Sequence, residues 1–232
     1  MQRENRKAEL GIRKFEPALH GKYQEETMEQ LIEKVLNTMT KAGLVEVEVS
    51  ARHVHLTAED VEILFGKGAV LHEKRPLSQK GQYLCEERVN LKGPKGSKER
   101  VAVLGPVRSA TQVELSVSDC VALGVQAPLR ESGDVEGSAP ITIEGPCGSI
   151  QIAQGTIVAH NHIHVPTDIA AMLQLTDKEH VSVRILSERP VTFDDVIIRV
   201  SDAFNFRMHI DFDEANAAAV RGFTLGQIIR RK

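Results

Sequence analysis

Apolar residues recur at helical spacing near the start of the chain. Thr27 fits a helix N-cap and Gly43 lies just past the expected end, so residues 27–43 predict a short amphipathic helix. Its apolar stripe consists of Met28, Leu31, Ile32, Val35, Leu36 and Met39. The helix either packs on the main domain or docks into an apolar groove of a partner. Residues 1–26 are polar and charged, which is typical of a poorly ordered segment.

From residue 45 onward the spacing changes to that of short strands. Alternating or continuous apolar runs, separated by Gly, Pro and Ser, occur at residues 45–50, 88–92, 100–105, 112–118, 140–145, 149–159, 180–186, 195–200 and 206–212. Short helical patterns occur at 57–66, 166–175 and 213–222. The chain is therefore predicted to be mainly β, a barrel or sandwich flanked by short helices.

One internal repeat links the two halves of this pattern. Residues 50–60, SARHVHLTAED, resemble residues 159–168, AHNHIHVPTD. Each copy has a strand, an H-x-H pair, an apolar residue and a capped helix start. This predicts two similar halves that arose by duplication, each contributing one pair of histidines.

Composition excludes several classes of protein. With 232 residues the chain is long enough for one large or two small domains. A net charge of -3, 4% aromatic residues and no Trp argue against a nucleic-acid binder. No apolar run is long enough to span a membrane, and the first residues lack the apolar stretch of a secretory signal, so none is expected. The three cysteines, Cys85, Cys120 and Cys147, form no CxxC pair, so a reduced intracellular setting is expected.

The histidines supply the first candidate chemistry. In a strand, residues i and i+2 point to one face, so an H-x-H pair aims two imidazoles at the same point. Nine histidines in this length give roughly 0.3–0.4 such pairs by chance. The chain has three, at 53/55, 160/162 and 162/164, and this excess favours metal binding. His20, His72 and His180 stand alone and are expected to be ordinary side chains.

Further ligands are needed to complete metal sites. His209 lies in a strand pattern, and Glu114 interrupts an apolar strand where a carboxylate is unusual. Asp211 faces the same way as His209 and is a candidate ligand or orienting group, whereas Asp213 fits the N-cap of the last helix. Imidazoles with one carboxylate suit zinc and tolerate cobalt or nickel, and six ligands suit two metals.

Basic residues indicate an anion site. Arg108, six residues before Glu114, presents a fork that fits phosphate, and Arg52 beside His53 is a second candidate. The loop at 91–100 carries several basic residues, of which Lys92 and Lys95 are candidates for contacting the phosphates of a large anionic substrate. A surface ion pair or a solvated turn would give the same pattern.

Five blocks in order resemble the phosphotransacylases of bacterial microcompartments, the phosphate propanoyltransferase type. They are SARHVHLT, LSQKGQYLCEERV, VAVLGPVRSATQVELS, HNHIHVP and MHIDFDEANAA, and the resemblance covers about residues 44–225. It implies two β-barrels related by duplication with the active site between them. Residues 44–51 and 160–232 would form one barrel, residues 52–159 the other, and residues 1–43 an N-terminal extension.

The resemblance also implies the site. It assigns Arg108 to phosphate and two zinc ions to one set of six ligands, namely His53, His55, Glu114, His162, His164 and His209. The usual arginine before the second pair is Asn161 here, preceded by His160, whose role is open, and a usual proline is Lys80. None of these changes touches the six ligands.

The function implied is reversible transfer of a short acyl group, propanoyl or acetyl, between coenzyme A and inorganic phosphate. Acyl-CoA, CoA, phosphate and acyl phosphate would be the substrates and products, with direct attack by phosphate and no protein nucleophile. The N-terminal helix would bind shell or core enzymes of a microcompartment in the cytoplasm, and a homo-oligomer is expected. The alternatives are a dinuclear zinc hydrolase of thioesters, which uses the same ligands, and a metal-stabilised scaffold protein.

Overall fold

The computed structural model describes residues 27–230; residues 1–26, predicted to be poorly ordered, and 231–232 lie outside the described part. The helices are α1 (Met28–Lys41), α2 (Ala58–Phe65), α3 (Val117–Leu123), α4 (Thr167–Leu173) and α5 (Phe212–Ala217). Among the described residues, no helix has the length and apolar character needed to cross a membrane.

The N-terminal helix α1 confirms the predicted helix and its cap. The backbone N–H of Gln30 donates to the Thr27 hydroxyl at 3.2 Å, and the Gln30 side chain accepts from the Thr27 N–H at 2.9 Å. This reciprocal pair is a capping box. Gly43, which follows the helix, has a φ of 72°, a conformation that glycine adopts without strain.

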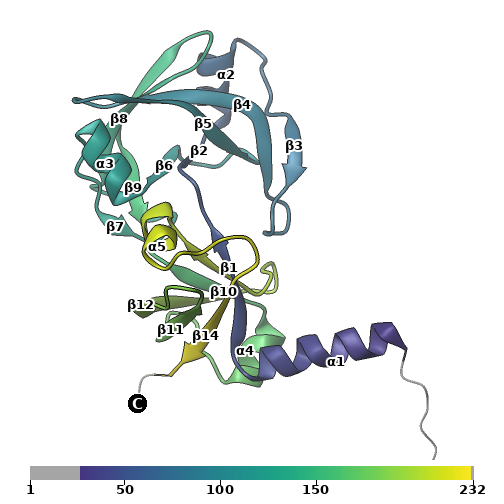
Figure 1. The fold of residues 1–232 in the computed structure, drawn as a ribbon. Helices are drawn as coiled ribbons and strands as arrows, with labels where there is room; N and C mark the ends of the chain where they lie inside the picture. Colours follow the sequence, from purple (N-terminus) through teal and green to yellow (C-terminus); the bar gives the residue numbers. More distant parts are fainter. Residues whose placement is uncertain (1–26, 231–232) are drawn as a thin grey trace, which may run out of the picture. The chain divides into compact units, whose positions relative to one another are not determined.

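Barrel 1 closes from strands at both ends of the sequence. Its order is β1 (Leu44–Val49), β13 (Arg207–Ile210), β10 (His162–Val165), β12 (Thr192–Val200), β11 (His180–Leu186) and β14 (Leu225–Ile229). Strand β14 pairs back to β1 and completes the ring. Alternation fills the interior, because Val181, Val183 and Ile185 of β11 are fully buried while their neighbours are not. Figure 1 shows β1 leading from this barrel into β2 of the other one.

Barrel 2 is built from the middle of the chain. Its ring consists of β2 (His53–His55), β5 (Ser97–Gly105), β4 (Tyr83–Lys92), β8 (Ala139–Glu144), β9 (Ser149–Ala159) and β6 (Gln112–Leu115). Two short strands extend it, β3 (Glu73–Pro76) beside β4 and β7 (Leu129–Arg130) beside β9. The predicted mainly β fold with two barrels is confirmed.

The two barrels repeat one pattern of strand pairing. Strand β2 pairs parallel with β5 and antiparallel with β6, and β10 pairs parallel with β12 and antiparallel with β13. The remaining pairs correspond as well, with β4, β8 and β9 matching β11, β14 and β1. The first strand of each half therefore sits in the barrel of the other half. Matching registers place equivalent residues at equivalent points.

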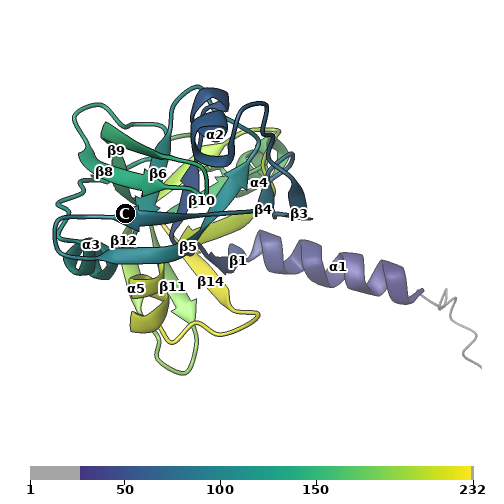
Figure 2. The same ribbon diagram turned by 90° about the horizontal axis from the view of Figure 1, so that it is seen from above.

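Two hairpin turns of sequence GPxG pack against helix ends in barrel 2. The turn at 93–96 donates the N–H of Lys95 to Leu123 O of α3 at 3.0 Å, and the turn at 145–148 donates the N–H of Cys147 to Leu64 O of α2 at 3.0 Å. A side chain at Gly93 would place its Cβ 2.2 Å from Leu123 O. The approach therefore requires glycine. Figure 2 shows α2 and α3 lying against the strands of this barrel.

The sequence pattern led to two wrong predictions, one for a helix and one for a helix cap. The run at 112–118 was predicted as a single strand, but β6 ends at Leu115 and α3 begins at Val117. Ser116 causes the change, since its side chain caps the helix at Asp119 N. The N-cap of α5 is Asp211, which forms a capping box with Glu214, so the assignment of this cap to Asp213 was wrong. Helices at the other two predicted places are confirmed, with shorter bounds.

Candidate active site

Equivalent strands of the two barrels carry two sets of three candidate ligands. His53 of β2 lies opposite Glu114 of β6, and His162 of β10 lies opposite His209 of β13 at the equivalent register position. His55 and His164 follow two residues along and share the face of their partners. We call His53, His55 and Glu114 the barrel 2 triad, and His162, His164 and His209 the barrel 1 triad.

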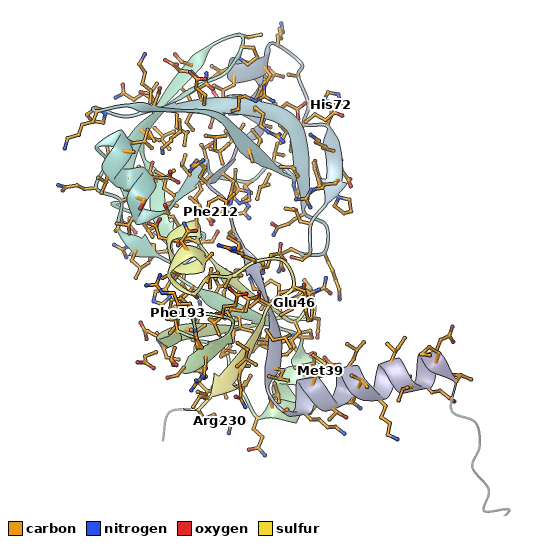
Figure 3. The ribbon with its side chains drawn as sticks, in the orientation of Figure 1. Met39, Glu46, His72, Phe193, Phe212 and Arg230 are labelled. Atoms are coloured by element: carbon orange, nitrogen blue, oxygen red, sulfur yellow. The ribbon has the colours of Figure 1, made fainter. Side chains whose placement is uncertain are left out.

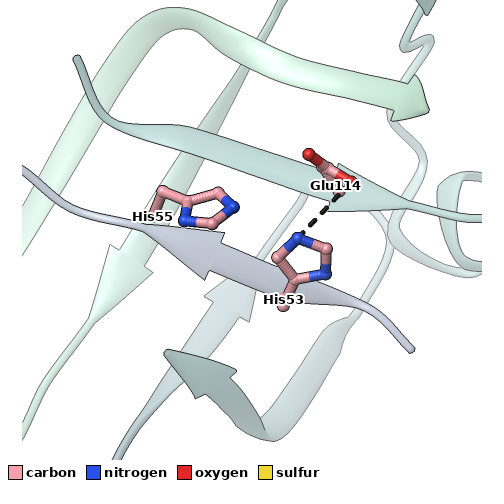
Figure 4. Close-up of side chains that lie close together, drawn as sticks. All are labelled: His53, His55 and Glu114. Carbon is pink, nitrogen blue, oxygen red and sulfur yellow. Dashed lines mark ion pairs between the residues drawn. The ribbon is translucent and has the colours of Figure 1, made fainter. Parts of the chain in front are cut away.

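The barrel 2 triad is compact (Figure 4). His53 Nε2 lies 3.4 Å from Glu114 Oε2, and the rings of His53 and His55 are 5.0 Å apart between centroids. Within residues 27–230, this is the one group of three that brings a ligand atom from each member within 4.8 Å of the others. All three side chains are largely buried, so their shared focus is shielded from bulk water.

Neighbouring groups fix the orientation of this triad. The N–H at His53 Nδ1 donates to Ala51 O at 2.8 Å, which turns Nε2 toward Glu114. Gln112 Nε2 donates to Glu114 Oε1 at 2.6 Å and to Ser132 Oγ at 2.9 Å, while Gln112 Oε1 accepts from Gly133 N at 2.8 Å. Gln112 was missed from the sequence, although its position two residues before Glu114 on the same strand face was a signal.

Burial and mutual charge set the protonation of this triad. Burial alone raises the pKa of Glu114, but the charge and hydrogen bond of His53 outweigh it, and the pKa falls well below the ordinary range. Burial lowers the pKa of His53, yet the charge of Glu114 raises it above its usual value. Burial, helped by the positive charges of His53 and Arg108, lowers the pKa of His55 to about 3. Glu114 is therefore an anion and His55 a neutral donor at neutral pH.

The barrel 1 triad is made of neutral imidazoles. Ring centroids lie 4.6 Å apart for His162 and His164, 5.2 Å for His162 and His209, and 4.8 Å for His164 and His209. Burial is the main cause of lowered pKa values, to about 2 for His164 and about 3 for His209, with that of His162 lowered too. Neutral imidazoles are the form that binds metals.

Ring nitrogens without protein partners indicate that the donor sets fit metal ions. The N–H at Nδ1 of His162 donates to His160 O at 2.8 Å, as His53 does to Ala51 O, so Nε2 is the ring nitrogen of each that remains for a metal; in His53 it lies 3.4 Å from Glu114 Oε2. In His55 and His164 the Nδ1 atoms are buried and have no partner. Imidazole and carboxylate donors of this kind are typical of zinc sites, and backbone acceptors for the second ring nitrogen are the usual support.

A loop from barrel 2 reaches the barrel 1 triad. Gln79 Nε2 donates to His209 Nε2 at 2.9 Å, and Gln79 Oε1 is buried without a partner. The same loop is tied to barrel 1 because Lys80 Nζ donates to Asp202 O at 3.1 Å and Asn205 donates to Ser78 O. Gln79 was missed from the sequence, where it is 130 positions away from His209 and shares no pattern with it.

One cavity of about 480 Å³ brings the predicted residues together. All six members of the two triads line it, and so does Arg108. Its size suits a small-molecule site. It is lined by five arginines, namely Arg52, Arg75, Arg88, Arg108 and Arg199, whereas its carboxylates are Glu48 and Glu114. The excess of positive charge favours an anionic ligand.

Arg108 lies at the wall of the cavity. Its backbone N–H donates to Leu56 O at 2.8 Å, and Nη1 donates to Ser132 Oγ at 3.4 Å. Arg52, the other arginine candidate, is held differently, because its Nε donates to Asp119 Oδ2 at 2.8 Å. Arg108 thus keeps a freer guanidinium than Arg52.

Lys92 and Lys95 lie outside the cavity lining. Lys92 Nζ pairs with Glu144 Oε1 at 3.3 Å on an exposed part of the sheet. Lys95 belongs to the GPxG turn on the end of α3, and a Cβ added at Gly124 would lie 2.6 Å from Lys95 Cγ. The turn at 93–96 thus packs against α3, whereas Arg75 and Arg88 line the cavity.

The remaining predicted residues have structural partners. Asp211 caps α5, and Asp213 accepts from Ser118 N at 2.7 Å, which joins α5 to α3. His160 and His180 both contact Asp195, at 3.3 Å and 2.8 Å. Figure 3 shows His72 beside β3, where Nδ1 lies 2.7 Å from Glu87 Oε1. Cys85 and Cys120 are buried and Cys147 is exposed, all as free thiols.

Comparison with known proteins identifies the family. The family model described as Phosphate propanoyltransferase matches residues 46–221. Curated proteins of that name are similar to this chain. The one from Clostridioides difficile is 46% identical over 89% of this chain and 99% of its own length. Those from Listeria monocytogenes and Leptotrichia buccalis are 46% and 51% identical, over 87% and 78% of this chain and 97% and 84% of their own lengths. The chain belongs to the phosphate propanoyltransferase family.

Proposed function

We propose that this protein is a phosphate acyltransferase that moves a short acyl group, propanoyl or acetyl, reversibly between coenzyme A and inorganic phosphate. The observation that carries the proposal is one cavity in which two triads from equivalent strands meet Arg108 and four further arginines. Family membership supports the activity. Phosphate and the phosphates of CoA both suit an arginine-rich cavity.

Two zinc ions would be held by the triads, one by each. When bound, zinc supplies positive charge that orients phosphate and stabilises negative charge on the thioester carbonyl oxygen. Low pKa values keep the barrel 1 imidazoles neutral as donors, and the Glu114 carboxylate adds one negative charge to the barrel 2 set. Cobalt or nickel would substitute in sites of this composition.

The side chains of the cavity position the reactants. Arg108 binds phosphate through its fork, and Ser132 holds the guanidinium in place. The phosphate oxygen then attacks the thioester carbonyl carbon, the bond to sulfur breaks, and acyl phosphate and CoA thiolate leave. Arg75 and Arg88, which line the cavity, join Lys92 and Lys95 outside it as candidates for binding the phosphates of CoA. Holding both reactants in one cavity supplies proximity, and no protein nucleophile takes part.

The test is CoA release from propanoyl-CoA and acetyl-CoA, with and without phosphate. We expect release that depends on phosphate, stops after complete metal removal, and falls at least about 100-fold in His162→Ala. His72→Ala, which changes an exposed histidine outside the cavity, is the matched control and keeps full activity. Release without phosphate would identify a hydrolase instead. Activity that survives both metal removal and His162→Ala would refute the site.

Helix α1 would direct the protein into a bacterial microcompartment in the cytoplasm. Its apolar stripe suits a groove on a shell or core enzyme. Leu31→Glu, placed in the stripe, should abolish co-purification with intact compartments, whereas Glu33→Gln on the polar face should leave it unchanged. Equal recovery of both variants would contradict this role. We also expect a homo-oligomer, which sedimentation of the full chain measures.

A further inference from the structure

Arg199 is a second arginine at the cavity, contributed by the opposite barrel to Arg108. It lies on β12 as the Cα partner of His164, and it lines the same cavity as Arg108. Its guanidinium carbon stands 5.9 Å from the ring centre of Phe204, whose ring is 4.0 Å from that of His164. The side chain is thus placed beside the barrel 1 triad while a quarter of it, 26%, stays exposed.

Adjacent residues of one barrel 2 loop contact the two arginines. Ser132 Oγ accepts from Arg108 Nη1 at 3.4 Å, and Glu131 Oε2 lies 3.9 Å from Arg199 Nε. The same Glu131 oxygen takes a shorter ion pair of 2.6 Å from Lys178. Glu131 is therefore close enough to attract Arg199 but too far away to take up a hydrogen-bond donor of its guanidinium. A short loop sets the relative position of one arginine from each barrel.

The two arginines form an electrostatic pair that favours an anion. Burial lowers the pKa of Arg108, Glu114 raises it, and the positive charge of Arg199 lowers it again. Burial is also the largest cause of the lowered pKa of His164, and Arg199 adds to it. Glu114 is engaged with His53 and Gln112. The cavity lining has five arginines and two carboxylates, so the positive charge of Arg108 and Arg199 is not balanced there.

We propose that Arg199 is a second phosphate-binding arginine, which with Arg108 clamps the phosphoryl group of inorganic phosphate or acyl phosphate from both barrels, and that Glu131 is its positioning residue. The inference rests on the proposed acyl transfer. A phosphate dianion at neutral pH matches two guanidinium charges, and each fork offers two donors to its oxygens. Because one arginine comes from each barrel, the clamp also depends on the placement of the two barrels by the loop at 131–132.

Kinetics of four variants separate a clamp from a structural role. Arg199→Gln should raise the KM for phosphate about 10–100-fold, as expected for loss of a charge-assisted pair, and change the KM for acyl-CoA less than about 3-fold. Arg199→Lys keeps the charge but loses the fork, so it should recover part of that loss. Glu131→Gln should raise the KM for phosphate about 3–10-fold. Lys178→Gln, which removes the other partner of Glu131, is the matched control and should behave as wild type.

Direct binding of inorganic phosphate to the full-length, zinc-loaded protein tests the clamp apart from catalysis. Titration calorimetry without acyl-CoA should show phosphate binding to the wild type, and binding at least about 10-fold weaker to Arg199→Gln. The melting temperatures of the two proteins should be equal. Equal phosphate affinity in the two proteins, or none in either, overturns the proposal, as does a parallel rise in both KM values. CoA release without phosphate would instead refute the acyl transfer, while the binding experiment still judges Arg199.

Discussion

Asp119 provides a sensitive test of how the site is supported. Its side chain is only 4% exposed, and its two carboxylate oxygens contact Arg52 Nε at 2.8 Å and Lys98 Nζ at 3.0 Å. Arg52 directly precedes the candidate ligand His53, so its ion pair with Asp119 anchors the start of β2. Asp119→Asn keeps the size of the side chain but leaves two cations beside a neutral amide. The substitution therefore tests the contribution of the Asp119 charge apart from that of its packing.

The expected loss of stability in Asp119→Asn follows from these contacts. Charge-assisted hydrogen bonds contribute about 1.5–3 kcal/mol each, but Arg52 and Lys98 are 35% and 27% exposed, and solvent screens both. We therefore expect Asp119→Asn to lower the free energy of unfolding by about 2 kcal/mol, or the melting temperature by about 4–8 °C for a chain of this size. Asp134→Asn is the matched control. Its exposed ion pair with Arg130, at 3.1 Å, should contribute under about 0.5 kcal/mol.

The pH dependence of this loss has a definite sign. Burial alone raises the pKa of Asp119, but the hydrogen bonds from Arg52 and Lys98 outweigh it and hold that pKa below the ordinary value. The stabilisation is therefore fully present above the unfolded pKa, about 3.9, and is lost as pH falls through the folded pKa. In urea denaturation, the difference in free energy of unfolding between wild type and Asp119→Asn should be constant from pH 7 to about pH 5. This difference should become smaller below about pH 4. Equal free energies of unfolding at pH 7, or a difference that stays unchanged on acidification, would refute the reasoning.

Three further changes test the site and its support. Glu114→Gln should weaken zinc binding at least about 10-fold in competition with a chelator, because it removes the anionic donor, whereas Glu48→Gln at the cavity wall should not; equal affinities would exclude Glu114 as a ligand. Gly93→Ala should cost about 1–3 kcal/mol of stability in urea denaturation, since its Cβ would meet Leu123 O, and a neutral result would show that the turn moves freely. Chelation of wild type should lower its melting temperature, an effect that excess zinc reverses; an unchanged melting temperature would argue against bound metal.

Local spacing predicted the parts of the site that lie on single strands. The pairs His53/His55 and His162/His164 follow from the two-residue period of a strand, and Glu114 follows from a carboxylate in an apolar run. Spacing could not predict that these residues meet in one cavity, because the pairing of β2 with β6 and of β10 with β13 cannot be read from a single sequence. Only the resemblance to a family implied it.

Contacts between distant segments defined what the sequence did not reveal. Gln79 and Arg199 reach the cavity through a loop and a strand with ordinary patterns, so neither stood out. Lys92 and Lys95 were noticed for their charge, but Lys92 pairs with Glu144 on the sheet and Lys95 lies in the GPxG turn beside α3, so neither lines the cavity. The start of α3 at Ser116 was missed because it lies within an apolar run. Short helices and short strands have similar compositions, and here only the capping serine distinguishes them.

The exchange of first strands between the barrels imposes an order on folding during synthesis. Barrel 2, from β2 to β9, is contiguous and can close as soon as β9 leaves the ribosome. Strand β1 emerges before it but must wait for β13 and β14, its partners near the other end of the chain. Until then the edges of β1 are unpaired and open to association with other chains. Because His209 arrives with β13, a nascent or prematurely terminated chain that lacks β13 has only the barrel 2 triad complete, so the cavity proposed for catalysis is assembled only near the end of synthesis.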